Sequence, residues 1–433
     1  MLRWTWNLRD FANCFPPDDW QGRHPTPAAV AHCRYQLLPA MKAHREPLKE
    51  TIEIAGAGPA GLAAALTIAG QNGRAVVFER NPDVGHRFHG DFQGLENWTS
   101  EVDVLEDLSS FGISPTFEYT AFRECVFYDP YGHEHVCRAA QPLFYLVRRG
   151  PDQDTLDQAL KEQALAAGVE IRFNEERRHL PQGGIVTHGP QCVDAISAGY
   201  VFETDQADGA FAAVSDQLAP NGYAYLLVCK GKGTIASCLF ADFHRERIYV
   251  ERTVDFFREK TGIEIKNPQR FGGFGNLFAS SNARKGNMLY AGEAAGFQDA
   301  LFGFGMRYAM LSGHLAARSL MIGRPEDYDR LWRKRLSNTL KLAVVNRVIF
   351  ERLGDSGRAR LLRMIGKAPD ARDWMGRYYG VGRLKKLLYP LAYRRIAGRS
   401  ELVAACMESC DCTLCRCLKA GFSANGSVPG CRP

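Results

Sequence analysis

Long apolar runs are missing from this chain of 433 residues. None reaches the roughly 18 residues that a membrane-spanning helix needs. The first residues, MLRWTWNLRDFANCFPPDDW, also lack the continuous apolar segment that directs secretion, because polar residues interrupt them. We therefore expect a cytoplasmic protein. Its 13 cysteines are then interpreted first as thiols or metal ligands, and only second as disulfides.

Acidic residues are scarce in one part of the chain. Between Arg330 and Ser400 stand nineteen Lys and Arg against four acids, a net charge of +15, whereas the whole chain carries +6. Two segments here, RLWRKRLSNTLKLAVVNRVIFERL and GRLKKLLYPLAYRRIAG, predict basic amphipathic helices. Such a region suits an anionic membrane surface, so a peripheral position at a membrane is one expectation, and an ordinary solvated basic face is the alternative. No nucleic-acid-binding module accompanies the charge, so we expect no nucleic-acid partner.

A glycine-rich turn is present near the start of the chain, in the stretch IEIAGAGPAGLAAAL. It has the spacing G-x-G-x-x-G and consists of Gly56, Ala57, Gly58, Pro59, Ala60 and Gly61. The residues before it predict a strand and those after it a helix. A second strand, RAVVFE, ends in Glu79 and is followed by Arg80. This is a dinucleotide-binding βαβ pattern: the glycines admit a pyrophosphate, the helix N-terminus faces its charge, and the acid accepts ribose hydroxyl groups.

A second pattern of this kind, which a flavin reductase with its own nicotinamide site would show, is lacking. Near residue 290, however, comes NMLYAGEAAGFQDALFGFGMRYAMLSGHLAARSL, with Gly292, Glu293, Gly303 and Gly305. A strand, glycine turns and a long amphipathic helix again predict bare backbone and a helix N-terminus beside an anionic or electron-rich ligand. We expect Glu293 to bind sugar hydroxyl groups.

The two motifs at this separation resemble the FAD-dependent oxidoreductases of the p-hydroxybenzoate hydroxylase and geranylgeranyl reductase superfamily. The resemblance implies an α/β fold, in which a Rossmann-like FAD-binding domain is interleaved with an antiparallel β-sheet substrate domain and followed by a helical C-terminal region. It also implies that the early motif holds the ADP half of FAD, and that the late motif holds the ribityl chain and the flavin ring.

Two further segments resemble the same superfamily. FYLVRRGPDQDTLDQALKEQALAAGVEIRF predicts that Arg148 or Arg149 meets the pyrophosphate, with a solvated turn as the alternative. GYAYLLVCKGKGTIASCLF resembles the substrate-domain sheet, and its alternation predicts one face toward a cavity. Asp299 and Ala300 stand where the proline of the late motif is common. The middle motif, around which relatives bind NADPH, is not recognisable, so the electron donor is not identified.

The reacting end is expected in GHRFHGDFQGLENW, which runs from the adenine end toward the isoalloxazine in the resembled fold. Arg87 could neutralise the reduced flavin or the pyrophosphate. His89 and Asp91 could donate protons, and the alternative for both is local hydrogen bonding within a loop.

The C-terminal sequence CMESCDCTLCRCLKAGF contains four cysteines spaced C-x-C-x-x-C-x-C, namely Cys410, Cys412, Cys415 and Cys417. Such spacing allows thiolates to converge on zinc or an iron–sulfur cluster. Disulfides or free thiols are the alternatives. We expect this tail to be structural or to bind a partner, and nothing in its sequence places it beside the flavin.

The sequence thus predicts five segments: an N-terminal extension (1–50), a discontinuous FAD-binding domain (51–150 and 271–325), a helix linker with a substrate-binding sheet (151–270), a basic helical region (326–400) and a cysteine-rich tail (401–433). The predicted function is that of a geranylgeranyl-reductase-like FAD-dependent oxidoreductase that reduces a double bond in a hydrophobic, prenyl or lipid-like substrate. A flavin-dependent monooxygenase is one alternative. The other is an electron-transfer flavoprotein without a small substrate of its own.

Overall fold

The computed structural model describes residues 51–190, 193–277, 282–380 and 382–397, together with Thr413 and Cys415. The expected N-terminal extension and Cys410, Cys412 and Cys417 lie outside these residues. The strands are β1 (Ile52–Ala55), β2 (Ala75–Glu79), β3 (Phe92–Glu96), β4 (Tyr119–Phe122), β5 (Glu124–Tyr128), β6 (Glu134–Arg138), β7 (Phe144–Arg148), β8 (Glu170–Phe173), β9 (Gly184–Val186), β10 (Ala195–Glu203), β11 (Gly209–Ala213), β12 (Tyr223–Cys229), β13 (Lys232–Leu239), β14 (Lys266–Gly275), β15 (Arg284–Lys285) and β16 (Met288–Tyr290). The helices are α2 (Pro59–Ala69), α3 (Val104–Ser110), α4 (Leu156–Ala166), α5 (Glu246–Thr261), α6 (Met306–Met321), α7 (Tyr328–Arg352), α8 (Gly354–Gly366), α9 (Ala371–Tyr378) and α10 (Arg383–Ala397), with short 3-10 turns at Phe243–Arg245, Gly292–Ala295 and Pro325–Asp327.

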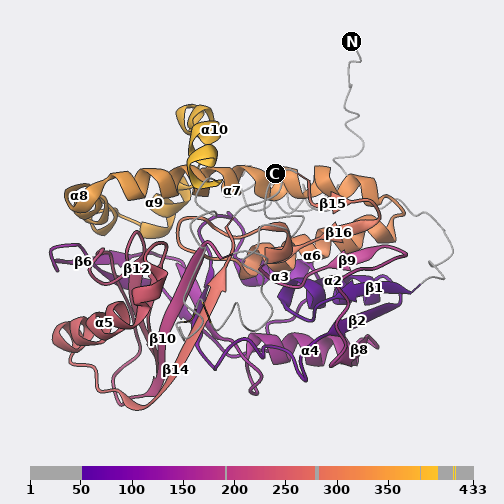
Figure 1. Ribbon diagram of the computed structural model, residues 1–433, viewed down its shortest axis with the longest axis horizontal. Helices are drawn as coiled ribbons and strands as arrows, with labels where there is room; N and C mark the ends of the chain where they lie inside the picture. Colours follow the sequence, from indigo (N-terminus) through magenta and orange to yellow (C-terminus); the bar gives the residue numbers. More distant parts are fainter. Residues whose placement is uncertain are drawn as a thin grey trace, which may run out of the picture. The chain divides into compact units, whose positions relative to one another are not determined.

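The first sheet is parallel over most of its width. Its order is β15-β16-β9-β1-β2-β8, and only β15 pairs antiparallel, with β16. The predicted strand, helix and second strand are confirmed as β1, α2 and β2 (Figure 1). Because β1, β9 and β16 run in the same direction, the turns that follow all three lie at one edge of the sheet, where ligands bind in folds of this type.

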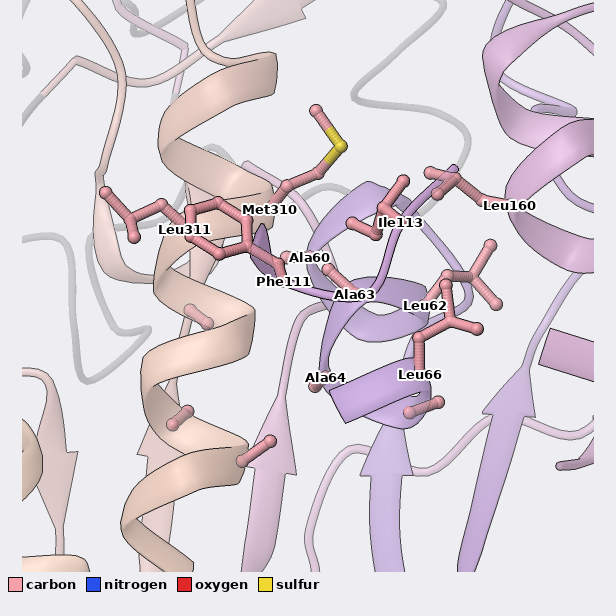
Figure 2. Packing of buried hydrophobic residues seen from close by; sticks show 14 of the residues in the cluster. Ala60, Leu62, Ala63, Ala64, Leu66, Phe111, Ile113, Leu160, Met310 and Leu311 are labelled. Carbon is pink, nitrogen blue, oxygen red and sulfur yellow. The ribbon is translucent and has the colours of Figure 1, made fainter. Parts of the chain in front are cut away.

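Helix α2 is buried along almost its whole length and packs closely against α6. Figure 2 shows Ala60, Ala63 and Ala64 of this helix in the same apolar cluster as Met310 and Leu311 of α6. The approach is close enough that a Cβ added to Gly313 of α6 would lie 2.0 Å from the carbonyl oxygen of Ala60. Small side chains on both helices therefore set the spacing between the two elements that carry the glycine motifs.

The second sheet has seven strands in the order β14-β10-β13-β12-β11-β5-β6. Its strands are antiparallel except at the β11–β5 pair, which is parallel. Residues alternate between its faces, as the sequence of β12 predicts. Ala224, Leu226 and Val228 belong to an apolar cluster that includes Phe257 of α5, whereas Tyr223, Tyr225 and Leu227 line a cavity.

A third, small sheet has the strand order β3-β7-β4, and all its pairs are antiparallel. Its first residue, Phe92, donates its backbone N–H to the hydroxyl oxygen of Thr234 in β13 at 2.8 Å, which ties it to the seven-stranded sheet.

Sheet membership divides the chain differently from the spans expected from the sequence. Strands β5 and β6, expected in the FAD-binding domain, belong to the seven-stranded sheet, and β8, β9 and α4, expected outside that domain, belong to the parallel sheet and its helices. The motifs mark turns and ligand contacts, but strand pairing joins segments that are far apart in sequence, and no local pattern reports that pairing.

The four C-terminal helices follow α6, and Figure 1 shows α7 running alongside α8 and α9. This region is more than a basic face, because α7 buries Trp332 and Arg347 and α8 buries Arg358. Among the helices in the described ranges, none combines the length and apolar character that crossing a membrane requires.

The contact between α2 and α6 generates the first prediction. Replacing Gly313 with Ala should lower the thermal midpoint by several degrees, equivalent to about 1–3 kcal/mol, because the new methyl group would overlap the Ala60 carbonyl. Gly273→Ala is the matched control, since a Cβ there meets no described atom within 4 Å. Equal midpoints for the two variants, measured by circular dichroism, would contradict this account of the packing.

Candidate functional site

The early glycine turn joins β1 to α2. Gly56 has a φ of +106°, and a Cβ added there would lie 2.6 Å from the carbonyl oxygen of Thr187. A Cβ added to Gly61 would lie 2.0 Å from the carbonyl oxygen of Gly56. The protein itself therefore requires these two glycines. Gly58 is different: its φ is −78°, and an added Cβ would meet no atom within 4 Å in the described part of the chain.

The open space beside Gly58 lies at the N-terminus of α2. Gly58 is the N-cap residue, Pro59 follows it, and no side chain of the described residues caps this end of the helix. Gly58, Pro59 and Ala60 line a cavity of about 460 Å³. An uncapped helix N-terminus with bare backbone attracts negative charge. The turn therefore has the shape and the electrostatics to hold a phosphate group.

Glu79 stands at the end of β2 and is 9% exposed. Its Oε2 atom accepts a hydrogen bond from the backbone N–H of Ala57 at 2.9 Å, and its Oε1 accepts from the backbone N–H and the amide of Asn81 at 3.0 and 2.7 Å. Ala57, Glu79, Arg80 and Asn81 all line the cavity. The carboxylate thus fixes the glycine turn, and it keeps acceptor capacity for a hydroxyl group.

The late glycine motif lines the same cavity. Gly292, Glu293, Gly303 and Gly305 all belong to its wall, so the structure brings the two sequence motifs together. Gly292 has a φ of +62°, and a Cβ added to it would lie 3.0 Å from the Cβ of Ala60 in the early motif. Close contact between the motifs therefore depends on the absence of a side chain at Gly292.

Arg87 and Glu293, predicted separately as cofactor-binding residues, form an ion pair. The Nη1 atom of Arg87 lies 3.0 Å from Oε2 of Glu293, and Nη2 donates to the carbonyl oxygen of Phe274 at 2.9 Å. Both side chains line the cavity. The buried Nε of Arg87 has no hydrogen-bond partner among the described residues, so one donor remains for another acceptor.

Arg148, the last residue of β7, and Arg149, which follows the strand, have different surroundings. Arg149 lines the cavity, but its guanidinium donates to both carboxylate oxygens of Asp157 at 2.8 and 2.9 Å and stacks over Phe88 at 4.1 Å. Arg148 lies outside the cavity wall and donates to Glu118 at 3.3 Å. The sequence offered Arg148 or Arg149 for the pyrophosphate, and of these two only Arg149 lines the cavity, so the geometry favours Arg149.

The two candidate proton donors, His89 and Asp91, differ in their position relative to the cavity. Asp91 lines the cavity and is 2% exposed, whereas His89 does not belong to the wall. The Asp91 carboxylate accepts hydrogen bonds from the backbone N–H of His89 at 3.0 Å and from the Gln93 amide at 2.9 Å. Burial raises the pKa of Asp91 above its usual range, although these hydrogen bonds oppose the shift. Asp91 is thus placed to hold a proton beside the cavity.

A second part of the cavity, which we call the aromatic chamber, is lined by aromatic and other apolar side chains. The ring of Trp98 meets the edge of Phe304 at 4.9 Å, and Tyr223 meets Phe302 at 5.6 Å. Further wall residues come from the small and the seven-stranded sheets or directly adjoin their strands, namely Leu143, Phe144, Cys125, Phe127, Cys137, Phe211, Tyr225, Leu227, Cys238 and Phe240. A chamber of this composition suits a hydrophobic molecule.

Three chamber residues come from the region expected to be a basic surface. Ile365 of α8 and Ala371 and Met375 of α9 belong to the wall. The sequence did not predict them as site residues, because the net charge of this region pointed to a solvent-exposed or lipid-binding surface. The available signal was the apolar spacing within these helices, which indicates a buried face but not the cavity that this face covers.

Asp299 organises the late glycine loop. Its carboxylate accepts from the backbone N–H groups of Leu301 and Phe302 at 3.3 and 2.7 Å, and from the Tyr379 hydroxyl at 3.1 Å to each oxygen. Burial raises the pKa of Asp299 to about 6. Asp299 thus fixes a turn at a position where a proline is common in the resembled superfamily, and it does so through hydrogen bonds instead of a ring.

Arg347 of α7 holds the same loop from a second direction. Its Nε donates to the carbonyl oxygen of Ala300 at 2.8 Å, and its Nη atoms donate to the carbonyl oxygens of Asn221 and Leu301. The guanidinium stacks over Phe240 at 3.6 Å. Burial lowers the pKa of Arg347. The backbone carbonyls and the aromatic face replace the water that this cation loses.

The described residues of the tail contact the seven-stranded sheet. Thr413 donates its backbone N–H and its hydroxyl to the buried Glu246 carboxylate at 2.9 and 2.8 Å, and its side chain covers Gly272 of β14. Gly272 lines the cavity, so the tail lies closer to the site than its sequence indicated.

Cys415 is buried and disulfide-bonded, so its sulfur is not the thiolate that a metal needs. The predicted metal site of four cysteines therefore lacks this ligand in the structure, and its other three members lie outside the described residues. Within the described ranges, no cluster of His, Cys, Asp and Glu side chains could hold a metal ion.

No known protein family and no curated protein matches the chain. Solved structures do match. A geranylgeranyl bacteriochlorophyll reductase-like protein from Thermoplasma acidophilum is 16% identical, with 81% of this chain and 99% of that chain covered and a TM-score of 0.60. The flavin-dependent brominase Bmp2 is 13% identical over 80% and 100% of the two chains, with a TM-score of 0.53. A flavoprotein/dehydrogenase from Cytophaga hutchinsonii is 12% identical over the same shares, also with a TM-score of 0.53.

These similarities confirm the predicted α/β fold, in which a parallel sheet and an antiparallel sheet are combined with helices, and the matched structures include flavoproteins. The matched proteins are named for a reductase-like protein, a halogenase and a dehydrogenase. The fold is therefore common to several reactions and does not by itself select one of them.

The loop clamp generates a prediction about pH. Because the pKa of Asp299 is raised to about 6, the folded state binds a proton more tightly than the unfolded state, where an Asp titrates near 3.8. The stability that the proton contributes is fully present below the unfolded pKa and is lost as the pH rises through the folded pKa. The unfolding free energy of the wild type, relative to Asp299→Asn, should thus fall by about 1–3 kcal/mol from pH 4 to pH 7.

Urea unfolding at several pH values tests this trend, and Asp152→Asn is the control for the same substitution at an exposed position. A constant difference between the wild type and Asp299→Asn would show that Asp299 does not titrate in this range.

Proposed function

We propose that this chain is a FAD-dependent oxidoreductase that reduces a double bond in a hydrophobic, prenyl- or lipid-like substrate. The observation that carries the proposal is the single cavity. Its wall contains the helix N-terminus and glycines of the early motif, the late glycine loop, and the side chains of the aromatic chamber. One continuous space thus offers both a dinucleotide site and a place for an apolar molecule.

The early motif would hold the ADP half of the cofactor. The N-terminal amides of α2 and the open space at Gly58 suit the pyrophosphate, and the Glu79 carboxylate suits ribose hydroxyl groups. Gly58 supports this assignment most directly, because no described protein atom near it explains the absence of a side chain.

The late loop would hold the ribityl chain and the flavin ring. Its wall contains Gln298, whose amide donates to the carbonyl oxygen of Gly303 at 2.8 Å. The Oε1 atom of Gln298 is buried and has no partner among the described residues, as is also true of Nε of Arg87. A buried acceptor and a buried donor without partners cost free energy, and a polar ring edge in the cavity would satisfy them.

When bound, FAD supplies the electron pair of a reduction as a hydride. The protein's own contribution is to bind the substrate, to exclude water and to deliver a proton. The aromatic chamber does the first two. Asp91 is the proposed proton donor, because burial favours its protonated form and its carboxyl group lies in the cavity wall. Zinc or an iron–sulfur cluster in the tail forms no part of the proposal, since Cys415 is disulfide-bonded.

Gly58→Val tests the dinucleotide site. The free energy of unfolding of the FAD-free variant should stay within about 1 kcal/mol of the wild-type value, since no described atom meets the new Cβ. The variant should nevertheless lose FAD on purification, because the side chain would fill the space proposed for the pyrophosphate. Gly61→Val is the contrasting variant and should be strongly destabilised, because its Cβ would overlap the Gly56 carbonyl. A full complement of FAD in Gly58→Val would place the pyrophosphate elsewhere.

Asp91→Asn tests the reaction. Anaerobic protein reduced with dithionite and mixed with geranylgeraniol should regain the absorbance of oxidised flavin, and the product should gain two hydrogen atoms by mass spectrometry. Asp91→Asn should slow this step about 10²- to 10⁴-fold while FAD stays bound, because the general acid is lost. His89→Ala is the control and should react at the wild-type rate, since His89 lies outside the cavity wall.

An unchanged rate in Asp91→Asn would exclude this residue as the proton donor. Product that forms only with oxygen and gains one oxygen atom would replace the reductase with the alternative monooxygenase. Fast exchange with a quinone, without any reaction of the alcohol, would favour the electron-transfer flavoprotein.

A further inference from the structure

Helix α10 has one face packed against the protein and the opposite face open. Ala392 and Ile396 are buried in the apolar cluster that also contains Val344, Val345 and Val348 of α7. Figure 1 shows α10 projecting beyond α7, on the side of α7 that faces away from the labelled strands. Part of this helix is therefore fixed to the core, and the rest stands free.

The free face carries large apolar side chains. Leu387 is 75% exposed, Leu391 is 64% exposed and Leu388 is 37% exposed. Leu387 and Leu391 are four residues apart and thus lie one above the other on the helix surface. Exposed leucines are normal when they stand singly, but three on adjoining positions of one helix mark a surface that is covered in use.

The charges around these leucines have one sign. The sequence between Asp373 and Glu401 contains seven Lys and Arg and no acid. Lys386, Arg394 and Arg395 of α10 are exposed, and none of them makes an ion pair within the described residues. We name the six exposed side chains Lys386, Leu387, Leu388, Leu391, Arg394 and Arg395 the α10 ridge.

We propose that the α10 ridge docks the protein onto an anionic lipid surface. Leucine side chains enter the boundary between head groups and acyl chains, and the neighbouring cations meet the lipid phosphates. Both kinds of side chain fit this partner, because the leucines match the apolar acyl-chain region of the lipids and the cations match their anionic head groups.

The rest of the basic region offers fewer free cations to a lipid surface than its composition indicated. Arg333 pairs with Asp329, Arg335 with Asp107 and Arg358 with Asp216. Trp332, which lies in the first of the two predicted basic amphipathic helices, is buried in the core. The proposed lipid-binding surface is therefore α10 alone and not the whole of residues 326–400.

Two other occupants fit the ridge less well. A second copy of this chain packed on the ridge about a twofold axis would bring the cations of both copies together without an acid between them. A nucleic acid would attract the cations, but it would leave the leucines in water. The lipid surface alone accounts for both kinds of side chain.

The position of the ridge has a further implication. Lys385 of α10 donates to the carbonyl oxygen of Tyr378 at 2.5 Å and lies 4.4 Å from the centre of its ring, which fixes α10 to the end of α9. Met375 and Ala371 of α9 line the aromatic chamber. The proposed lipid contact thus adjoins a helix of the chamber wall. The docking itself does not depend on the bound cofactor or on the proposed reaction.

Vesicle flotation of the full-length protein tests the docking. The wild type should bind vesicles of phosphatidylcholine with 30% phosphatidylglycerol and should not bind pure phosphatidylcholine. Leu387→Ser with Leu391→Ser, and separately Arg394→Glu with Arg395→Glu, should each weaken binding at least tenfold. Binding should also weaken between 0.1 M and 1 M salt, as the Debye length falls from about 10 Å to about 3 Å.

Matched controls come from other exposed surfaces. Leu165→Ser on α4, where the leucine is 48% exposed, and Arg252→Glu with Arg258→Glu on α5 should bind as the wild type does. Circular dichroism shows whether each variant is folded, and Leu387→Trp adds a probe whose fluorescence should shift to the blue on anionic vesicles.

Three outcomes would overturn the proposal: equal binding to neutral and anionic vesicles, no binding to either, or an equal loss of binding in the control variants. Sedimentation of the same variants distinguishes one alternative, since a dimer that the leucine substitutions dissociate, without vesicle binding, would assign the ridge to a second copy of the chain.

Discussion

The structure depends on one close contact, in which the first turn of α2 lies against bare backbone on two sides. Gly61 packs on the carbonyl of Gly56, and Gly313 of α6 packs on the carbonyl of Ala60. Because α6 follows the late glycine loop directly, the contact that positions α6 also positions Gly292 beside the early motif. Any side chain at these glycines would separate the two halves of the cavity.

This contact explains how motifs that are far apart in sequence form one site. The turns after β1, β9 and β16 lie at the same sheet edge, and the helices that follow β1 and β16 bring their N-termini toward it. The polar end of the cavity is therefore a property of the backbone, whereas the aromatic chamber is a property of side chains from several distant segments.

The sequence predicted the features that a local pattern can encode. The βαβ unit, the alternation of β12 and the position of Glu79 all follow from the spacing of apolar and small residues within short windows. Contacts between distant segments have no such pattern. The ion pair of Arg87 with Glu293 and the parallel pairing of β5 with β11 are examples, and each joins segments more than eighty residues apart.

The number of Lys and Arg residues did not correctly predict the basic surface of residues 326–400. A count does not distinguish an exposed cation from a buried one. Arg347 was part of the predicted basic surface, but it is 2% exposed and donates to three backbone carbonyls. Arg149 is also buried, and its guanidinium donates to both carboxylate oxygens of Asp157. In both cases the burial of the guanidinium, which the sequence does not report, decides its role.

The clamp on the late glycine loop has a consequence for the order in which the protein matures. The loop at residues 299–305 is held by Arg347 and Tyr379, which leave the ribosome after it. A nascent chain that has exposed both glycine motifs still lacks the helices that fix the second one and close the chamber. The pocket is thus completed only after residue 379 has been synthesised, which favours ligand binding after the C-terminal helices have folded over binding to the shorter nascent chain.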